Sequence, residues 1–198
     1  MNFLSINNIS FKYENKTIFD SFSKKFPEGE LSVIMSPSGS GKTTLLYLIA
    51  GLLSPDSGTI TYPCPSPRFS MVFQDNRLID GISVAHNIKL ANPSLSGDDI
   101  NEALKALKLN DLSHKRVCNL SGGEKQRVSI TRAILADYDI LLLDEPFTGI
   151  DDDNKLAVID YLKKRTAGKT VLLVTHDKSE AALCGGSISY LDGCLIDI

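Results

Sequence analysis

The chain has 198 residues, of which 42% are hydrophobic and 23% are charged; this is near ordinary globular usage and supplies one buried core. Its formal charge is −3, from 21 basic and 24 acidic residues. No large positive field therefore exists to hold nucleic acid or anionic lipid unselectively, and we expect no nucleic-acid partner. The four cysteines include no C-x-x-C pair, so we expect neither a disulfide framework nor a zinc site.

No membrane-spanning or targeting segment is predicted. The first residues, MNFLSINNIS, lack a basic start followed by an apolar run. The longest apolar stretch, 45–53, is far shorter than the roughly 20 residues that cross a bilayer. We therefore expect a soluble chain that reaches a membrane only through a partner.

The N-terminal segment is predicted to form short antiparallel strands. Apolar residues recur through 3–11 and again through 18–26, and the turn Pro27-Glu28-Gly29 ends this part.

A strand, a loop and a helix are predicted next, in that order. The continuous apolar run 31–35 is typical of a strand that is buried on both faces. Small residues at 36–41 form a loop, and a helix over 43–53 is stopped by the turn at 54–58.

The remaining elements alternate between strands and helices. After a proline-rich stretch, 69–73 is predicted as a strand and 94–109 as a small helical insertion. Strands follow at 140–143 and 170–174, with an amphipathic helix over 152–164 between them. This alternation predicts an α/β fold in which helices pack on a mostly parallel sheet. One further helix and a closing hairpin over 187–197 complete the chain.

Residues 36–43, SPSGSGKT, nearly match the phosphate-binding pattern G-x-x-x-x-G-K-[ST]. Glycines let such a loop curl so that its N–H groups face inward, and the next helix adds partial positive charge. Lys42 would reach the β- and γ-phosphates, and the Thr43 hydroxyl would bind Mg²⁺. Ser36 departs from the usual first glycine. A short pattern can match by chance, but the strand before it and the helix after it supply the expected context. The predicted nucleotide cradle comprises Ser36, Pro37, Ser38, Gly39, Ser40, Gly41, Lys42, Thr43 and Thr44.

The apolar run 140–143 ends in two carboxylates, Asp144 and Glu145. Ligands of open α/β sheets bind at the carboxyl ends of strands. Asp144 therefore suits a Mg²⁺ ligand acting through water, and Glu145 suits a base that polarises the attacking water. The alternative is a plain strand that ends in a solvated acidic turn.

Residues 120–127, LSGGEKQR, resemble the signature sequence of ATP-binding cassette (ABC) ATPases. Ser-Gly-Gly at the start of a helix can donate N–H groups and a hydroxyl to an anion. The same residues could simply cap a helix over 124–136. The resemblance implies that Ser121, Gly122 and Gly123 contact a γ-phosphate.

The resemblance implies both a fold and further site residues. The fold is a P-loop NTPase core with a mostly parallel sheet, an N-terminal antiparallel β subdomain and a small helical signature subdomain. One ABC ATPase domain would cover 1–198, with the core at about 1–90 and 137–198 and the helical part at about 91–136. Tyr13 resembles the aromatic residue that stacks on adenine, Gln74 the glutamine that contacts Mg²⁺ and the attacking water, and His176 the switch histidine at the γ-phosphate. The implied catalytic residues are Glu145, His176, Gln74 and Lys42, and the implied metal ligands are Thr43, Gln74 and Asp144.

ATP and Mg²⁺ are the implied cofactors, and the implied assembly has two ATPase subunits arranged head to tail. Integral membrane permease subunits would receive the motion at the cytoplasmic face, with a solute-binding protein acting through the permease. Residues 74–84 resemble the permease-docking stretch of importers, most closely of the nitrate, sulfonate and taurine group. Three alternatives stay open: an ATPase of a lipoprotein-release or cell-division complex, a soluble ABC ATPase without a transport role, and an inactive nucleotide-binding regulator.

Overall fold

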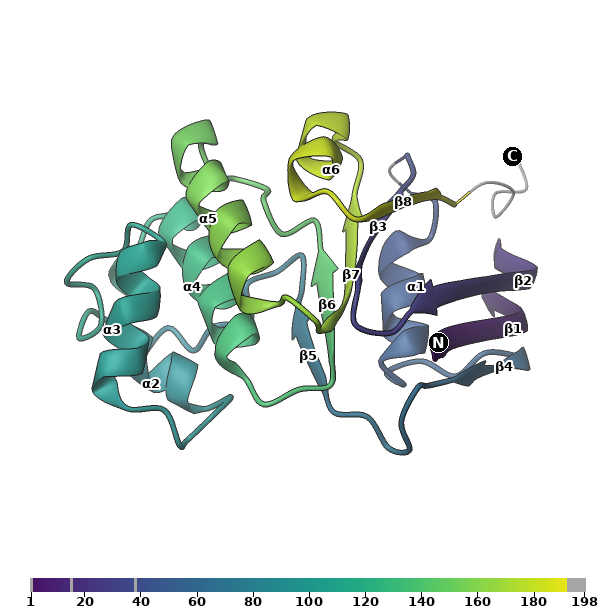
Figure 1. Ribbon diagram of the computed structural model, residues 1–198, viewed down its shortest axis with the longest axis horizontal. Coiled ribbons are helices and arrows are strands. Elements are labelled where there is room, and N and C mark those ends of the chain that lie inside the picture. Colours follow the sequence, from purple (N-terminus) through teal and green to yellow (C-terminus); the bar gives the residue numbers. More distant parts are fainter. Residues whose placement is uncertain (1, 15, 38, 192–198) are drawn as a thin grey trace.

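A five-stranded parallel sheet runs through the middle of the described part of the chain, residues 2–14, 16–37 and 39–191 of the computed structural model (Figure 1). Every neighbouring pair of its strands is parallel. The strands, in spatial order, are β5 (Phe69–Val72), β6 (Ile140–Asp144), β7 (Thr170–Thr175), β3 (Leu31–Met35) and β8 (Ser187–Tyr190).

The strands of this sheet are apolar at successive positions because both faces of the sheet are covered. On β6, Leu141 and Leu143 belong to one hydrophobic cluster, while Ile140 and Leu142 belong to the other. Successive side chains of a strand point to opposite faces, so only a continuous apolar run can fill both clusters. This confirms the predicted fold class, α/β with a mostly parallel sheet.

A separate three-stranded antiparallel sheet forms from the N-terminal segment, with the strands in the order β2 (Lys16–Pro27), β1 (Phe3–Tyr13) and β4 (Ser57–Thr61). The β1 pairing is irregular between Ile6 and Ile9, where Asn8 has a φ of 48°. This irregularity allows two residues three positions apart to be buried on the same side. Beside it, a Cβ at Gly58 would lie 2.3 Å from the Asn8 carbonyl oxygen, so the close strand approach requires glycine.

The helices cover the parallel sheet on its two faces (Figure 1). On one face, α1 lies between the two sheets, and its leucines pack against β1, β2 and the parallel strands. The other face is covered by the remaining helices. None of the described helices is long and apolar enough to cross a membrane. The helices are α1 (Lys42–Ile49), α2 (Val84–Lys89), α3 (Gly97–Ala106), α4 (Gly122–Leu135), α5 (Asp152–Arg165) and α6 (Lys178–Cys184), with a short 3₁₀ turn at Val117–Asn119.

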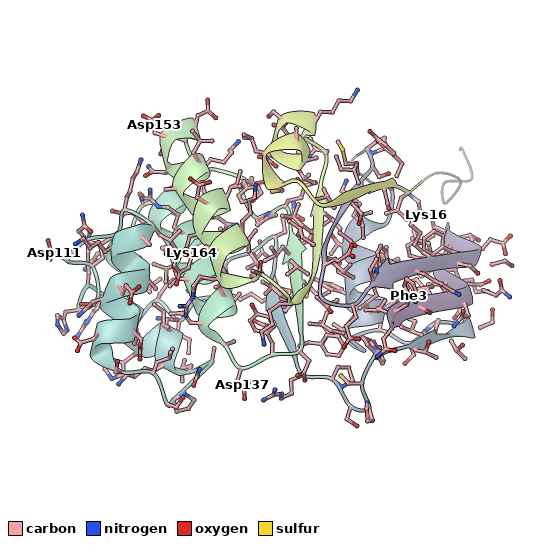
Figure 2. The ribbon with its side chains drawn as sticks, in the orientation of Figure 1. Phe3, Lys16, Asp111, Asp137, Asp153 and Lys164 are labelled. Carbon is pink, nitrogen blue, oxygen red and sulfur yellow. The ribbon has the colours of Figure 1, made fainter. Side chains whose placement is uncertain are left out.

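Several element boundaries differ from the sequence-based expectation. The helix expected over 43–53 ends at Ile49, and the helix α2 was not predicted. Of the hairpin expected over 187–197, the first part is β8, which pairs in parallel with β3, and residues 192–198 lie outside the described part. Figure 2 shows charged side chains such as Asp111, Asp153 and Lys16 at the outer rim, as their exposure requires.

Candidate active site

The loop between β3 and α1 carries the phosphate-binding pattern and opens directly onto a helix start. Gly41 has a φ of 86°, and a Cβ there would lie 2.6 Å from Ile18 Cγ2, so only glycine fits. Among the described residues no side chain caps the first turn of α1, and that turn carries no acidic residue. The first N–H groups of α1 and the positive end of its dipole are therefore available to an anion.

Lys42 is almost completely buried and folds back over this loop. Its Nζ donates hydrogen bonds to the carbonyl oxygens of Ser36 at 2.8 Å and Pro37 at 2.9 Å. It also lies 3.6 Å from Glu145 Oε1. The lysine charge is thus held between the loop and the end of β6.

The Thr43 hydroxyl meets the first of the two carboxylates at the end of β6. Thr43 Oγ1 donates to Asp144 Oδ2 at 2.7 Å, and only 1% of Asp144 is exposed. Burial raises the pKa of Asp144, and the hydrogen bond from Thr43 opposes that rise. A hydroxyl and a carboxylate oxygen at this distance are the type of donor set that Mg²⁺ takes from a protein alongside substrate phosphates.

The second carboxylate joins two neighbouring strand ends. Glu145 has a φ of 46°, and its N–H donates to the Val174 carbonyl oxygen of β7. His176 Nδ1 donates to Glu145 Oε2 at 2.8 Å, and this hydrogen bond is the main cause that raises the pKa of His176. A non-glycine residue at positive φ is uncommon and is often found at functional sites. This backbone conformation places the Glu145 side chain between Lys42 and His176.

Lys42, Thr43, Asp144 and Glu145 line one cavity of about 250 Å³. His176 contacts Glu145 but is not among the described residues that line the cavity, and neither are Ser36, Pro37 and Ser40. Gln74, which follows β5, reaches the same cavity, as does Ile18 from β2, a contact that the sequence analysis did not anticipate. In the sequence, Ile18 is one of the apolar residues that predict a strand, and no motif includes it. The cavity is lined by Ile18, Gly39, Gly41, Lys42, Thr43, Thr44, Gln74, Asp144 and Glu145.

Two serine hydroxyls of the loop are buried without a hydrogen-bond partner among the described residues. They belong to Ser36 and Ser40, which are 7% and 1% exposed. An unsatisfied buried hydroxyl is costly, so a ligand whose polar atoms reach this loop would gain hydrogen bonds from both serines. Ser36 has no positive φ, unlike Gly39 and Gly41, and so its backbone tolerates a side chain.

The structure does not bring every predicted site residue to this cavity. Tyr13 is 46% exposed at the end of β1, packs edge-on against Phe11 and is not among the described residues that line the cavity. Ser38 lies outside the described residues.

The signature residues stand apart from the cavity, at the start of α4. Ser121 caps the helix, since its Oγ accepts from the Glu124 N–H at 3.2 Å while Glu124 Oε2 accepts from the Ser121 N–H at 2.7 Å. Ser121 and Gly122 remain exposed. A Cβ at Gly123 would lie 2.9 Å from the Gly149 carbonyl oxygen, so this helix start presses against the loop that follows β6. The helix α4 and the helix α1 lie on opposite faces of the parallel sheet (Figure 1).

The fold and the cavity define a class of protein. A buried strand, β3, leads through a glycine-bearing loop with Lys42 and Thr43 into a helix start. Beside this helix start lie carboxylates at the end of β6, which β7 separates from β3 in the sheet. That arrangement is a P-loop nucleotide-binding site in an α/β protein.

Comparisons with known proteins identify the family. The profile described as "ABC transporter" matches residues 19–148. The chain is 34% identical to the aliphatic sulfonates import ATP-binding protein SsuB 3 of Rhodococcus jostii, over 98% of this chain and 74% of that protein. It is 35% identical to the taurine import ATP-binding protein TauB of Roseobacter denitrificans, over 92% of this chain and 75% of that protein. A bacterial ABC transporter cassette solved as a dimer superposes with a TM-score of 0.81 and 29% identity, covering 95% of this chain and 94% of that one.

The chain therefore belongs to the ABC transporter family, as its nucleotide-binding, ATP-hydrolysing component. ATP binding and hydrolysis to power transport, expected from the signature sequence, are confirmed by this membership.

Proposed function

We propose that two copies of this chain close around Mg-ATP and that hydrolysis, with Glu145 as general base, drives solute import through membrane partners. One observation carries this proposal. Lys42, Thr43, Asp144 and Glu145 converge in one cavity with Gln74, while Ser121 and Gly122 of the signature lie exposed elsewhere on the same chain. A second copy is the simplest source of the missing contacts.

Lys42 and the start of α1 would hold the phosphates. The Lys42 ammonium is already desolvated and aimed across the cavity, so an incoming phosphate can replace the carbonyl oxygens of Ser36 and Pro37 as its partners. A charge-assisted bond to phosphate is stronger than a bond to a neutral carbonyl. The Ser40 hydroxyl and the N–H groups of the loop would complete the cradle. Tyr13 would stack on the adenine from the exposed end of β1.

Thr43, Asp144 and Gln74 would hold the Mg²⁺ ion. The Thr43 hydroxyl and the Asp144 carboxylate already touch, and Gln74 lines the same cavity. When bound, Mg²⁺ neutralises phosphate charge and orients the oxygens around the γ-phosphate.

Glu145 would take the proton of the attacking water. The buried Lys42 and the exposed His176 contact its two oxygens, and the side chain is only 14% exposed. His176 would hold Glu145 in place and then contact the γ-phosphate. Gln74 would signal the state of the cavity to the neighbouring segment.

The signature helix of the partner copy would close each site. Ser121 and Gly122 are exposed at the N-terminus of α4, a helix of 14 residues that carries partial positive charge at that end. Binding of ATP across the boundary would favour the closed dimer, and hydrolysis would release it. The similar cassette of known structure is itself a dimer, which supports this arrangement.

Import is the direction that the similar proteins favour, since those quoted above are named for aliphatic sulfonate and taurine import. The segment after Gln74 supplies a surface for a permease. Its Ile79 is 50% exposed, while the buried Asn87 amide holds the Ile79 backbone through two hydrogen bonds. The chain would sit on the cytoplasmic face of the membrane, bound to permease subunits, with the core and helical subdomain divided as the sequence predicts.

The first test is the Glu145→Gln variant, which keeps the shape of the side chain but cannot take a proton. We expect it to bind Mg-ATP, to elute as a dimer in size-exclusion chromatography with Mg-ATP, and to turn over at least about 100-fold more slowly, since general-base catalysis contributes that much. The matched control is Glu102→Gln, the same change at an exposed position on α3, which should behave as the unaltered chain.

Two results would contradict the proposal. A Glu145→Gln protein that hydrolyses ATP at the normal rate would remove Glu145 from its role as base. A Glu145→Gln protein that stays monomeric with saturating Mg-ATP would contradict the proposed closed dimer.

The transport partner is tested separately, by purifying the tagged chain from membranes and identifying the integral subunit that accompanies it. We expect a multi-span permease. Recovery of ribosomes or DNA instead would overturn the transport role.

A further inference from the structure

A buried carboxylate lies outside the cavity, on the short helix α6. Glu180 is only 6% exposed, and both of its oxygens have partners. A buried charge is tolerated only when it is paired and hydrogen-bonded. The identity of these partners indicates what Glu180 does.

One carboxylate oxygen of Glu180 is hydrogen-bonded to the turn that contains His176. Glu180 Oε2 accepts from Thr175 Oγ1 at 2.6 Å, and Thr175 Oγ1 in turn accepts from the Asp177 N–H at 3.1 Å. In a usual capping box the third residue of the helix accepts directly from the N-cap N–H. Here the Thr175 hydroxyl is inserted between them, so the residues on both sides of His176 are fixed to one carboxylate.

The other oxygen of Glu180 reaches a different helix. Lys155 Nζ, in the first turn of α5, lies 3.0 Å from Glu180 Oε1. This hydrogen bond is the main cause that raises the pKa of Lys155. The helix α5 begins after the loop whose Gly149 presses against the start of α4. Glu180 therefore links the histidine turn to the helix that follows this loop.

We propose that Glu180 is a positioning residue for hydrolysis: through Thr175 it holds His176 against Glu145, and through Lys155 it ties that turn to α5. The inference rests on the proposed function, because it concerns the same reaction. Neither Glu180 nor Thr175 is among the described residues that line the nucleotide cavity. Substitutions that remove the Glu180 charge or the Thr175 hydroxyl should therefore leave Mg-ATP binding unchanged. They should slow turnover, because His176 is no longer held against Glu145.

Two substitutions at Thr175, which is fully buried, separate the hydroxyl from the packing. Thr175→Val keeps the shape and loses the hydroxyl, while Thr175→Ser keeps the hydroxyl and loses a methyl group. We expect Thr175→Val to lower kcat about tenfold or more, because small misplacements of catalytic groups have effects of that order, with KM for Mg-ATP unchanged. Thr175→Ser should keep a kcat close to that of the unaltered chain even if its melting temperature falls.

Two further variants test the carboxylate and the helices. Glu180→Gln removes the charge that Thr175 and Lys155 share, and we expect it also to lower kcat with KM unchanged. Lys163→Met is the matched control, because the exposed Lys163 also joins α5 to α6, donating to the Leu183 carbonyl oxygen at 3.3 Å, but does not touch this network. Its kcat should not change.

The outcomes distinguish this inference from the proposed function. If the unaltered chain hydrolyses Mg-ATP and Thr175→Val and Glu180→Gln do so equally fast, the positioning role fails and the proposed function stands. Equal losses in Thr175→Ser and Thr175→Val would assign the effect to packing and also overturn the positioning role. If the unaltered chain hydrolyses no ATP, the proposed function itself fails.

Discussion

Glu145 shows how much of the site depends on one backbone conformation. Its positive φ lets a residue at the end of β6 direct its side chain toward His176, which follows β7, and toward Lys42 at the start of α1. A negative φ would send the side chain elsewhere, and the three groups would not meet. The carboxylate is predictable from the sequence as a strand-end acid, but its strained backbone is not, because φ here is set by the neighbouring strand.

The contact between Glu145 and His176 predicts a shifted histidine titration. In the nucleotide-free protein the His176 pKa should lie above the ordinary histidine value of about 6.5, mainly because of the hydrogen bond from its ring to Glu145. We expect Glu145→Gln to lower that pKa. Ring-proton NMR against pH measures both values, and an unchanged His176 pKa in the variant would contradict the contact.

The same shift has a defined effect on stability. A raised folded-state pKa means that the ion pair contributes fully below the unfolded pKa of about 6.5, and that the contribution is lost as pH rises through the folded pKa. Because the His176 side chain is 59% exposed, solvent screens this pair and the contribution is small. As pH rises from the unfolded to the folded pKa, the free energy of unfolding measured by chemical denaturation should therefore fall only slightly in the unaltered chain, and less in Glu145→Gln.

At the scale of elements, type was easier to predict than boundaries. The helix after the phosphate-binding loop was expected to continue to residue 53 because residues 45–53 are largely apolar. It ends at Ile49, since Gly51 turns the chain with a φ of 69° and Leu52 is 56% exposed. The helix α2 is not predictable from apolar periodicity because it has only six residues. Its start is stabilised instead by the Ser83 hydroxyl, which accepts from the His86 N–H, and by the buried Asn87, which donates to the Ser83 carbonyl oxygen. The Glu180 network was also missed, because a D-x-x-E pattern indicates a capping box and does not reveal the inserted Thr175.

Two serine helix caps of the same type allow structure and function to be separated. Ser96 on α3 and Ser121 on α4 both form capping boxes. Each serine-to-alanine change should lower the free energy of unfolding by about 1 kcal/mol, because each removes one helix cap. Only Ser121→Ala should also lower kcat/KM for Mg-ATP, by roughly tenfold or more, since a hydrogen bond to a charged group contributes about 1.5–3 kcal/mol.

Urea unfolding and steady-state ATPase assays on both variants make this comparison. Equal ATPase activity in Ser96→Ala and Ser121→Ala would show that Ser121 serves only as a cap, which is the alternative that the sequence left open.

At the scale of the whole molecule, the parallel sheet is the part of the fold that the sequence predicts, because strands buried on both faces are apolar at successive positions. The apolar strands 31–35, 140–143 and 170–174 indicated parallel neighbours, and the structure joins them as β3, β6 and β7. The sequence could not indicate strand order, since apolar runs alike in composition can pair in several ways. It also could not show that β8 adds to β3 in parallel. What places α1 and α4 on opposite faces of the sheet is the order of the crossovers, a property of the entire chain.

The nucleotide couples this architecture to global stability, because the site draws groups from β2, α1, β6, the loop between β3 and α1, and the segment after β5 at once. A ligand that binds only the folded state stabilises it by about 2.7 kcal/mol at a concentration one hundredfold above its Kd. For a chain of this size that corresponds to a rise in melting temperature of roughly 5–11 °C. We expect Mg-ATP to produce this rise in the Glu145→Gln background, where the nucleotide is not consumed. Adding Lys42→Ala should abolish it, because the change removes the buried ammonium that we propose holds the phosphates. A thermal shift of equal size in the double variant would show that nucleotide binding does not depend on Lys42.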